Sequence, residues 1–358
     1  PMYFLIGVYG GDKRQYAAMK FLLYNLLGGL LMLAAVIGLY LQSPAGERTF
    51  GLAELVALDI DSTTQGWLFL GFMVAFAIKA PLWPLHTWLP DAATEAPSSQ
   101  AAYLSGVVDK VGTFGMVALV LPLFPDATQT FAPVVVTLAV ISVLYGGLLA
   151  IGQTDIKRII AFSSISHFGV IVLGIFALTS QGTSGSTFYM VSHGLSTAAL
   201  FIVGGFLIAR RGSRRLADFG GVQKPAPILA GFMLVAGLSG LAMPGLATFV
   251  SEFLVLVGTF SRYQVAAALA TFGIVLAALY ILIMYQRTMT GPTTPETENT
   301  PDVRGREAII VAPLFALLIA LGVAPTAMLD PIDDATRQTL EQVGVTDPDP
   351  VFAQGGEE

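Results

Sequence analysis

The sequence predicts an all-α fold, a polytopic bundle of transmembrane helices in which two helices are broken. Hydrophobic residues make up 54% of the 358 residues and charged residues only 12%, whereas soluble domains carry roughly a quarter charged residues. Apolar stretches of about 20 residues, long enough to cross a bilayer core as a helix, recur along the whole chain. Proline interrupts two of these stretches. Together these features indicate an integral membrane protein with a mean hydropathy of +0.73.

The apolar stretches predict about nine full spans, preceded by the end of one more helix at residues 1–9. The nine are centred near Leu31, Met73, Lys110, Leu138, Val170, Leu200, Leu246, Ile274 and Leu317. Because the chain opens inside an apolar helix, we expect its N-terminal helices to lie outside this sequence. Residues 1–358 are therefore interpreted as a single, partial transmembrane domain, with 330–358 as a short polar C-terminal tail.

Two of the predicted spans are interrupted, one at residues 79–84 and the other at 242–246. Proline inside a helix removes a backbone hydrogen bond and breaks or kinks the helix. The two spans are five helices apart, so they are expected to cross the membrane in opposite directions. Broken helices of opposite direction are typical of transporters built from inverted repeats, whose sites lie at the breaks.

Basic residues are distributed unequally between alternate loops. Arg48, Arg262 and Arg337 fall on one side of the predicted bundle. The other side, which the positive-inside rule identifies as cytoplasmic, holds Lys13, Arg14, Lys20, Lys157, Arg158, Arg210, Arg211, Arg214, Arg215, Lys224, Arg287, Arg304 and Arg306. The two remaining lysines are left inside the membrane, and the acidic tail is expected outside the cytoplasm.

Several classes of function are excluded by composition. The chain has no cysteine and only three histidines, which rules out thiolate-bound iron–sulfur clusters, disulfides and Cys/His zinc sites in this chain. The net charge of −6 comes mostly from loop and tail residues and gives no support to nucleic-acid binding. His86, Asp91 and Glu95, after the first break, fit loop capping better than metal binding.

The two lysines inside the membrane are the first candidate site residues. Charged side chains at this depth are costly, and they persist chiefly where they face a polar interior. Lys79 lies just before the first break, where free carbonyls help to hold a cation, and the alternative is that it snorkels to the cytoplasmic end. Lys110 lies midway along an apolar span, and its alternative is a static ion pair. Asp109 projects about 100° away from it, so direct pairing of the two is not implied.

A carboxylate and two histidines complete the candidates. Glu252 follows the second break within apolar sequence and suits a proton carrier, or a static partner for a cation. His193 lies among small hydroxyl residues and suits proton relay, or an ordinary core role. His167 lies about three turns from Lys157 and suits a route by which protons enter, or an interhelical hydrogen bond. Lysines, a histidine and an acid spread over several helices indicate a hydrated proton path rather than a ligand pocket.

One motif carries a specific resemblance. The stretch FAIKAPLWPLHTWLPDA at residues 76–92, followed by TEAP at 94–97, resembles the signature of the antiporter-like subunits of respiratory complex I and of multisubunit sodium/proton antiporters. Residues 163–167 and 192–194 resemble two further segments of that family. An acid at position 252, where other members usually carry lysine, resembles the M type of subunit, whose mitochondrial counterpart is subunit four. The resemblance covers essentially the whole chain.

The resemblance implies roles for the candidate residues. Lys79 becomes the central protonatable lysine, Lys110 a bridging lysine, His193 a connecting relay and Glu252 the terminal group. The family also carries a glutamate that pairs with the central lysine, and it is expected upstream of Pro1. Quinone reduction elsewhere would change this pairing and drive a proton through Lys110, water and His193 to Glu252.

The same resemblance implies a setting. The chain would be a non-redox, proton-translocating subunit of NADH:quinone oxidoreductase in a bacterial or archaeal plasma membrane, with no catalytic activity of its own. NADH, flavin, iron–sulfur clusters and quinone would all bind to other subunits. The expected partners are the lipid membrane and the L-type and N-type antiporter-like subunits of a hetero-oligomer. The alternatives are a subunit of a multisubunit sodium/proton antiporter and a non-conducting spacer of the membrane arm.

Overall fold

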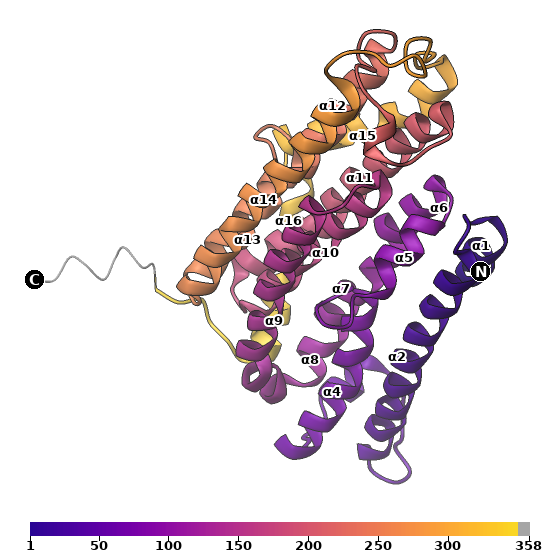
Figure 1. The fold of residues 1–358 in the computed structure, drawn as a ribbon. Coiled ribbons are helices and arrows are strands. Elements are labelled where there is room, and N and C mark those ends of the chain that lie inside the picture. Colours follow the sequence, from indigo (N-terminus) through magenta and orange to yellow (C-terminus); the bar gives the residue numbers. More distant parts are fainter. Residues whose placement is uncertain (350–358) are drawn as a thin grey trace, which may run out of the picture.

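The computed structural model describes residues 1–349 and shows helices running roughly side by side in an elongated bundle (Figure 1). Within these residues there is no β-strand, and a single bridge joins Asp155 to Arg215. Seven of the described helices are long and apolar enough to cross a membrane. The structure therefore confirms the predicted fold class, an all-α polytopic bundle.

Six long unbroken helices form most of the bundle: α2 (Arg14–Gln42), α9 (Pro125–Ile151), α10 (Ile156–Phe176), α11 (Ser180–Arg211), α14 (Gln264–Met289) and α15 (Gly305–Val323). The short helix α1 (Met2–Tyr9) precedes them, and the connections contain α3 (Leu52–Val56) and a 3₁₀ turn at Leu216–Asp218. Helix α10 is the centre of the bundle, because nearly all of its residues are buried.

The remaining spans are divided into pieces. The first broken span consists of α4 (Ser62–Lys79) and α5 (Trp88–Glu95), and the second consists of α12 (Pro227–Gly240) and α13 (Ala247–Phe260). Between α5 and α9, one continuous span alternates α and π geometry through α6 (Ser98–Tyr103), η1 (Leu104–Val108), α7 (Lys110–Gly115), η2 (Met116–Val120) and α8 (Leu121–Leu123). Eight of the nine predicted centres fall in helices, and Leu246 lies at the second break.

The first break follows directly from the prolines after Lys79. Helix α4 ends at Lys79, because Pro81 has no N–H and disfavours helical geometry at the residue before it. The carbonyl of Ile78 is not left unpaired, since the indole Nε1 of Trp88 donates a hydrogen bond to it over 2.9 Å. The break is therefore closed by a side chain from the helix that follows it.

The second break depends on backbone conformations that favour glycine. Gly245 has φ +94° and Ala242 has φ +53°, in the left-handed region that side chains other than glycine rarely adopt. Helix α15 packs directly on this turn, because a Cβ on Gly322 would lie 2.4 Å from the carbonyl oxygen of Gly245. The turn is thus held by close packing of two backbones.

One end of the bundle is joined by a network of ion pairs. Asp91 accepts hydrogen bonds from Lys20 at 2.8 Å and from Arg158 at 2.9 Å. Arg214 pairs with Glu95 at 2.9 Å and with Asp155 at 2.6 Å. Burial raises the pKa of the Asp155 carboxyl above its ordinary value, and the Arg214 guanidinium opposes this shift. Asp91 and Glu95 are therefore structural anchors for the segment after the first break.

The segment after Asp330 differs from its prediction. The sequence predicts a short polar tail from residue 330, whereas the structure contains the helix α16 (Thr326–Val343). It packs on α8, α9 and α11 through a face that buries Thr336, Leu340 and Val343. The helix escapes a search for apolar spans because only this one face is apolar. Residues 350–358 of the predicted tail lie outside the described residues.

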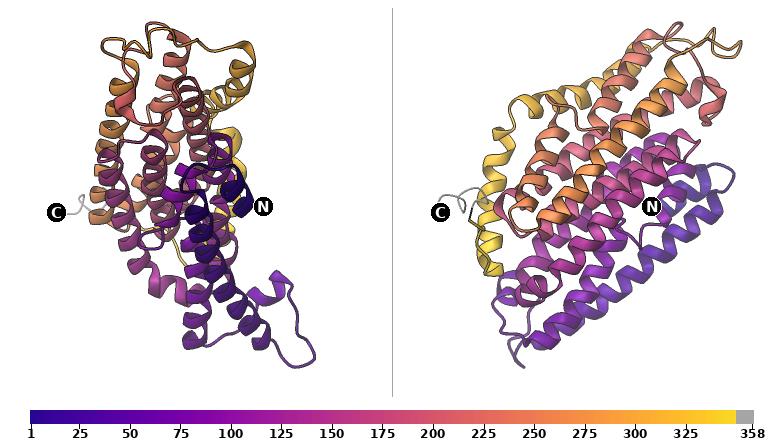
Figure 2. Two further views of the ribbon diagram at one scale, coloured as in Figure 1. Left: turned by 45° about the vertical axis from the view of Figure 1, so that its right-hand side comes forward. Right: turned by 60° about the vertical axis from the view of Figure 1, so that its left-hand side comes forward.

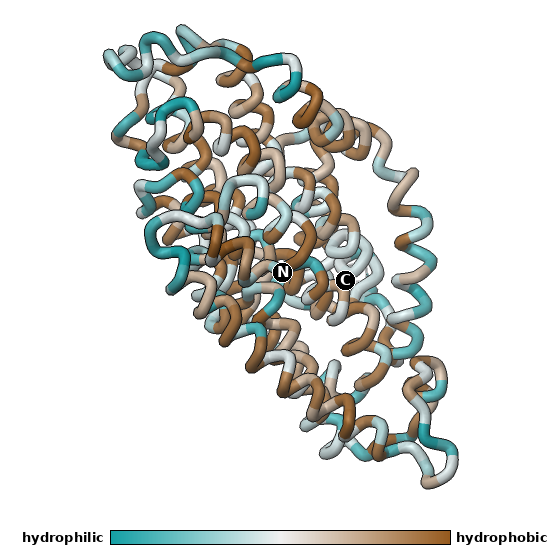
Figure 3. The backbone as a smooth tube through the Cα atoms, turned by 90° about the vertical axis from the view of Figure 1, so that its right-hand side faces the viewer, coloured by the Kyte–Doolittle hydropathy of each residue, from teal (hydrophilic) through white to brown (hydrophobic). Residues whose placement is uncertain are grey.

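Helix α16 lies along the outside of the bundle, as the right-hand view of Figure 2 shows in yellow. In Figure 3, polar residues gather at the two ends of the molecule, and apolar residues cover most of the length between them. This distribution suits a bundle whose long sides face lipid.

We predict that Arg214→Ala lowers the free energy of unfolding by about 2 kcal/mol, the scale of hydrogen bonds to charged groups. The substitution removes the cation from Glu95, whose side chain is 6% exposed. The measurement is the melting temperature of the full-length protein in detergent. Arg215→Ala is the matched control, because no ion pair is formed by the Arg215 side chain within the described residues. Equal melting temperatures for the two variants would contradict the prediction.

Candidate functional site

Lys79 is the last residue of α4 and is half-buried at the first break. Its Nζ donates a hydrogen bond to Oδ1 of Asn25 in α2 over 3.2 Å. The same amine lies 5.7 Å from the ring centre of Phe21. Lys79 is thus held by an amide and an aromatic face of the preceding helix, and it forms no ion pair within 4 Å among the described residues.

Lys110 and His193 form the central contact of the site. The Nζ of Lys110 lies 2.7 Å from Nδ1 of His193 and 2.6 Å from the carbonyl oxygen of Ser105. It also lies 4.5 Å from the ring centre of Phe168. Among the described residues Lys110 forms no ion pair within 4 Å, and its side-chain partner is the imidazole of His193.

The second nitrogen of His193 continues the chain of polar groups. Its Nε2 lies 2.9 Å from Oγ1 of Thr197 and 3.4 Å from Oγ of Ser164. A charged lysine can only donate, so Nδ1 accepts from Lys110 when that lysine is protonated. The ring can then take a proton at Nδ1 and release another from Nε2 towards the hydroxyls. This geometry is that of a relay across an imidazole.

His167 lies in the interior, beside His193. Its ring centre is 5.1 Å from that of His193, and its Nε2 lies 3.4 Å from the hydroxyl of Tyr280. The sequence places His167 on a route by which protons enter, and that role stays a prediction. The structure adds that this histidine is next to the relay rather than at the end of α10.

Glu252 lies on α13 and is buried, with the residue 5% exposed. The hydroxyl of Tyr189 donates a hydrogen bond to its Oε2 over 3.3 Å. Tyr189 also connects Glu252 with the histidines, since its ring centre lies 6.1 Å from those of His167 and His193. The three rings therefore pack against one another in the interior.

Two close helix contacts put these groups within reach of one another. A Cβ on Gly112 of α7 would lie 2.6 Å from the backbone nitrogen of Ala80 and 2.7 Å from the carbonyl oxygen of Phe76. On a different face of the same span, a Cβ on Gly106 would lie 3.2 Å from the carbonyl oxygen of Gly194. The span that carries Lys110 is therefore wedged between α4, at the first break, and α11.

Several members of the site were not predicted from the sequence. Asn25, Tyr189, Tyr280 and Thr197 all contact a predicted residue. A helical spacing rule could have found two of them, because Tyr189 and Thr197 lie four residues before and after His193 and so share its face of α11. No local pattern marks Asn25 or Tyr280, since their partners are more than 50 residues away.

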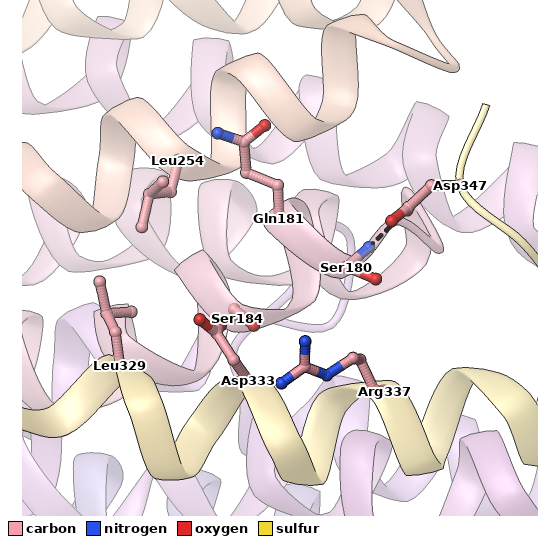
Figure 4. A pocket seen from close by; sticks show the side chains of 8 residues that line it. All are labelled: Ser180, Gln181, Ser184, Leu254, Leu329, Asp333, Arg337 and Asp347. Carbon is pink, nitrogen blue, oxygen red and sulfur yellow. Dashed lines mark hydrogen bonds between the residues drawn. The ribbon is translucent and has the colours of Figure 1, made fainter. Parts of the chain in front are cut away.

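Two cavities lie close to this region. A groove of about 670 Å³ between the α6–α7 span, α11, α15 and α16 is mostly apolar and includes Lys110 in its wall. A smaller pocket of about 340 Å³ lies between the start of α11, α13 and α16, where Asp333 and Arg337 point towards Ser184 (Figure 4). None of the predicted site residues lines the smaller pocket, so it is separate from the lysine–histidine chain.

The chain is similar to proteins of one family. The model of the family described as NADH:quinone oxidoreductase/Mrp antiporter, TM matches residues 1–277. Subunit M of the NADH-quinone oxidoreductase of Mycobacterium tuberculosis is 57% identical over 99% of this chain and 65% of its own length. The subunit M of Rickettsia prowazekii is 41% identical over 92% of this chain and 67% of its own length. The chain thus spans about two thirds of these relatives, and the predicted resemblance to M subunits is confirmed.

Solved structures agree with this result. A chain of respiratory complex I from Thermus thermophilus superposes with a TM-score of 0.91 at 34% identity, over 96% of this chain and 73% of the other. A chain of the Mrp complex from Dietzia superposes with a TM-score of 0.82 at 23% identity, over 96% of this chain and 73% of the other. At this lower identity, the second similarity concerns the fold alone.

We predict that Gly112→Ala destabilises the full-length protein by about 1–3 kcal/mol, the usual cost of overpacking. The new methyl group would push α7 away from the first break. Melting temperature in detergent is the measurement. Gly29→Ala is the matched control, because a Cβ at Gly29 meets no atom within 4 Å and alanine favours a helix by about 1 kcal/mol. The prediction is wrong if Gly112→Ala and Gly29→Ala have the same melting temperature.

Proposed function

We propose that this chain, which belongs to the NADH:quinone oxidoreductase/Mrp antiporter transmembrane family, conducts protons as a membrane subunit of NADH:quinone oxidoreductase. In this role NADH oxidation and quinone reduction take place in other subunits, and the chain couples them to proton movement across a bacterial plasma membrane. The proposal rests on the identity to M subunits and on the chain of buried polar groups described above.

One observation carries the proposal, the 2.7 Å contact between Lys110 and His193. A lysine and a histidine in direct contact within a membrane span are a poor static pair, because both groups carry positive charge when protonated. They are a good pair for exchange, since one proton shared between two nitrogens leaves a single charge on the pair. The contact therefore supports transfer rather than a purely structural role.

The path that we propose follows the order of the groups along the bundle. A proton held by Lys79 passes through the span of α7 to Lys110, and then to Nδ1 of His193. From the histidines it continues by way of Tyr189 to Glu252, which Tyr189 contacts directly. Glu252 is the last group of the path. Moving one elementary charge against a membrane potential of 100 mV costs about 2.3 kcal/mol. Quinone reduction in another subunit is proposed to supply this free energy.

The proposal includes the partners and the cofactors. NADH, flavin, iron–sulfur clusters and quinone are assigned to other subunits. For the clusters, the reason is that this sequence has no cysteine with which to bind one. Neighbouring antiporter-like subunits of the L and N types are proposed to flank it in a hetero-oligomer. A role in a multisubunit sodium/proton antiporter is the second candidate. The family model covers both classes and a chain of the Mrp complex shares the fold at 23% identity, whereas an M subunit is 57% identical.

We predict that Lys110→Ala and Lys79→Ala in the full-length subunit each reduce NADH-driven proton pumping by about 100-fold or more, the scale of a lost proton-transfer group. Lys110→Ala also leaves Nδ1 of His193 without its contact. The measurement is vesicle acidification per NADH oxidised in membranes that contain the whole complex. Lys224→Ala, at an exposed loop lysine, is the control. Normal pumping in both test variants would refute the proposal.

We predict that Glu252→Gln abolishes pumping while Glu252→Lys retains part of it. The amide cannot bind and release a proton, whereas a lysine at this position remains titratable and is within reach of Tyr189. The same vesicle assay measures both variants. If both pump normally, Glu252 is a structural residue and the path ends elsewhere.

A further inference from the structure

A gap remains in the path between Lys79 and Lys110. No hydrogen bond between described residues joins the two lysines, since Lys79 contacts Asn25 and Lys110 contacts Ser105 and His193. Asp109 is adjacent to Lys110 in the chain and lies one helical turn before Gly112, which packs on Phe76 and Ala80 beside Lys79.

Asp109 is fully buried, with 0% exposure. Both of its carboxylate oxygens lack a hydrogen-bond partner in the described structure. An isolated ionised carboxylate in such a place is very costly, so buried acids that serve as static counter-ions are paired and hydrogen-bonded. No ion pair within 4 Å is formed by Asp109 among residues 1–349. A static role does not account for this group.

The backbone places Asp109 on the face of the span that meets the first break. Residues three apart share one face of a helix, so Asp109 lies on the same face as Gly112, which packs on Phe76 and Ala80. The next residue, Lys110, is turned towards α11 and His193. Asp109 therefore lies on the side of this span that meets α4, and Lys110 lies on the side that meets α11.

The local helix geometry supports this placement. The π-helical segment η1 ends directly before Asp109, whose backbone N–H donates to the carbonyl oxygen of Leu104, five residues earlier, over 3.0 Å. From the sequence alone, Asp109 is expected to lie beside Lys110 in the chain without pairing with it. Single turns of π-helix often occur at functional sites, and this one fixes where the carboxylate points.

We propose that Asp109 is a further proton-binding residue of the path, which carries protons from Lys79 to Lys110. Because each amine lies more than 4 Å from the carboxylate, each step passes through a bridging water. In the first step an N–H bond of the Lys79 ammonium breaks, the water accepts this proton and gives another to Asp109, and an O–H bond forms on the carboxylate, which leaves both groups neutral. In the second step this O–H bond breaks and, through a second water, an N–H bond forms on the neutral amine of Lys110, which restores the carboxylate. The assignment rests on the proposed function.

The test uses the full-length subunit in the whole complex, with Asp109→Asn, Asp109→Glu and the control Asp12→Asn at an exposed loop position. We expect Asp109→Asn to lose about 100-fold or more of NADH-driven proton pumping, while Asp109→Glu keeps at least about half and Asp12→Asn is unchanged. Normal amounts of assembled complex in all three variants show that folding is intact.

A second readout separates a carrier from a fixed charge. Infrared difference spectra of the complex during turnover should contain the carbonyl band of a carboxylic acid that gains and loses a proton, and Asp109→Asn should remove this band. Full pumping by Asp109→Asn overturns the inference, as does a loss of pumping without a change in the band. Lys79→Ala and Lys110→Ala in the same series test the proposed function itself, because their failure to reduce pumping would refute it independently of Asp109.

Discussion

The structure depends on one constraint, that backbone polar groups inside a bilayer must be satisfied within the protein. Both broken spans meet it by hydrogen bonds formed at the break. At the first break, the indole of Trp88 donates to the carbonyl of Ile78. At the second, the N–H of Met243 donates to the carbonyl of Leu238 and the N–H of Leu246 to that of Met243. Because the breaks are closed in this way, Lys79 and Glu252 can lie beside them inside a folded bundle.

Close helix packing is the second requirement, and small residues provide it. Without Gly106 and Gly112, the span of Lys110 could not approach α11 and α4 as it does. This approach brings Lys110 against His193, 83 positions later in the chain. Small residues at helix contacts are common in membrane proteins because they let backbones meet. Here the consequence is chemical, since the same contact sets the distance between two titratable side chains.

The sequence could predict those features that are local. Apolar length and proline position give the spans and both breaks, and the cost of a buried charge marks Lys79, Lys110 and Glu252. Other features depend on tertiary contacts. Nothing local shows that Asn25 reaches Lys79, that His167 lies against His193, or that Tyr189 reaches Glu252. Helix α16 was hidden by its mixed composition, and the π-helical turn before Asp109 has no known sequence signature.

The arrangement of charges explains how a distant reaction can act on this chain. Two unit charges 4 Å apart interact by about 4 kcal/mol at an effective dielectric constant of 20, whereas moving one charge against 100 mV costs about 2.3 kcal/mol. A change in the partner of a single charged group is therefore large enough to drive one proton step. In the proposed path Asp109 exchanges protons with both Lys79 and Lys110, so a change in the charge of Lys79 alters the proton affinity at Lys110 without any movement of the helices. In this view, electrostatic coupling between fixed neighbours is sufficient to pass the effect along the bundle.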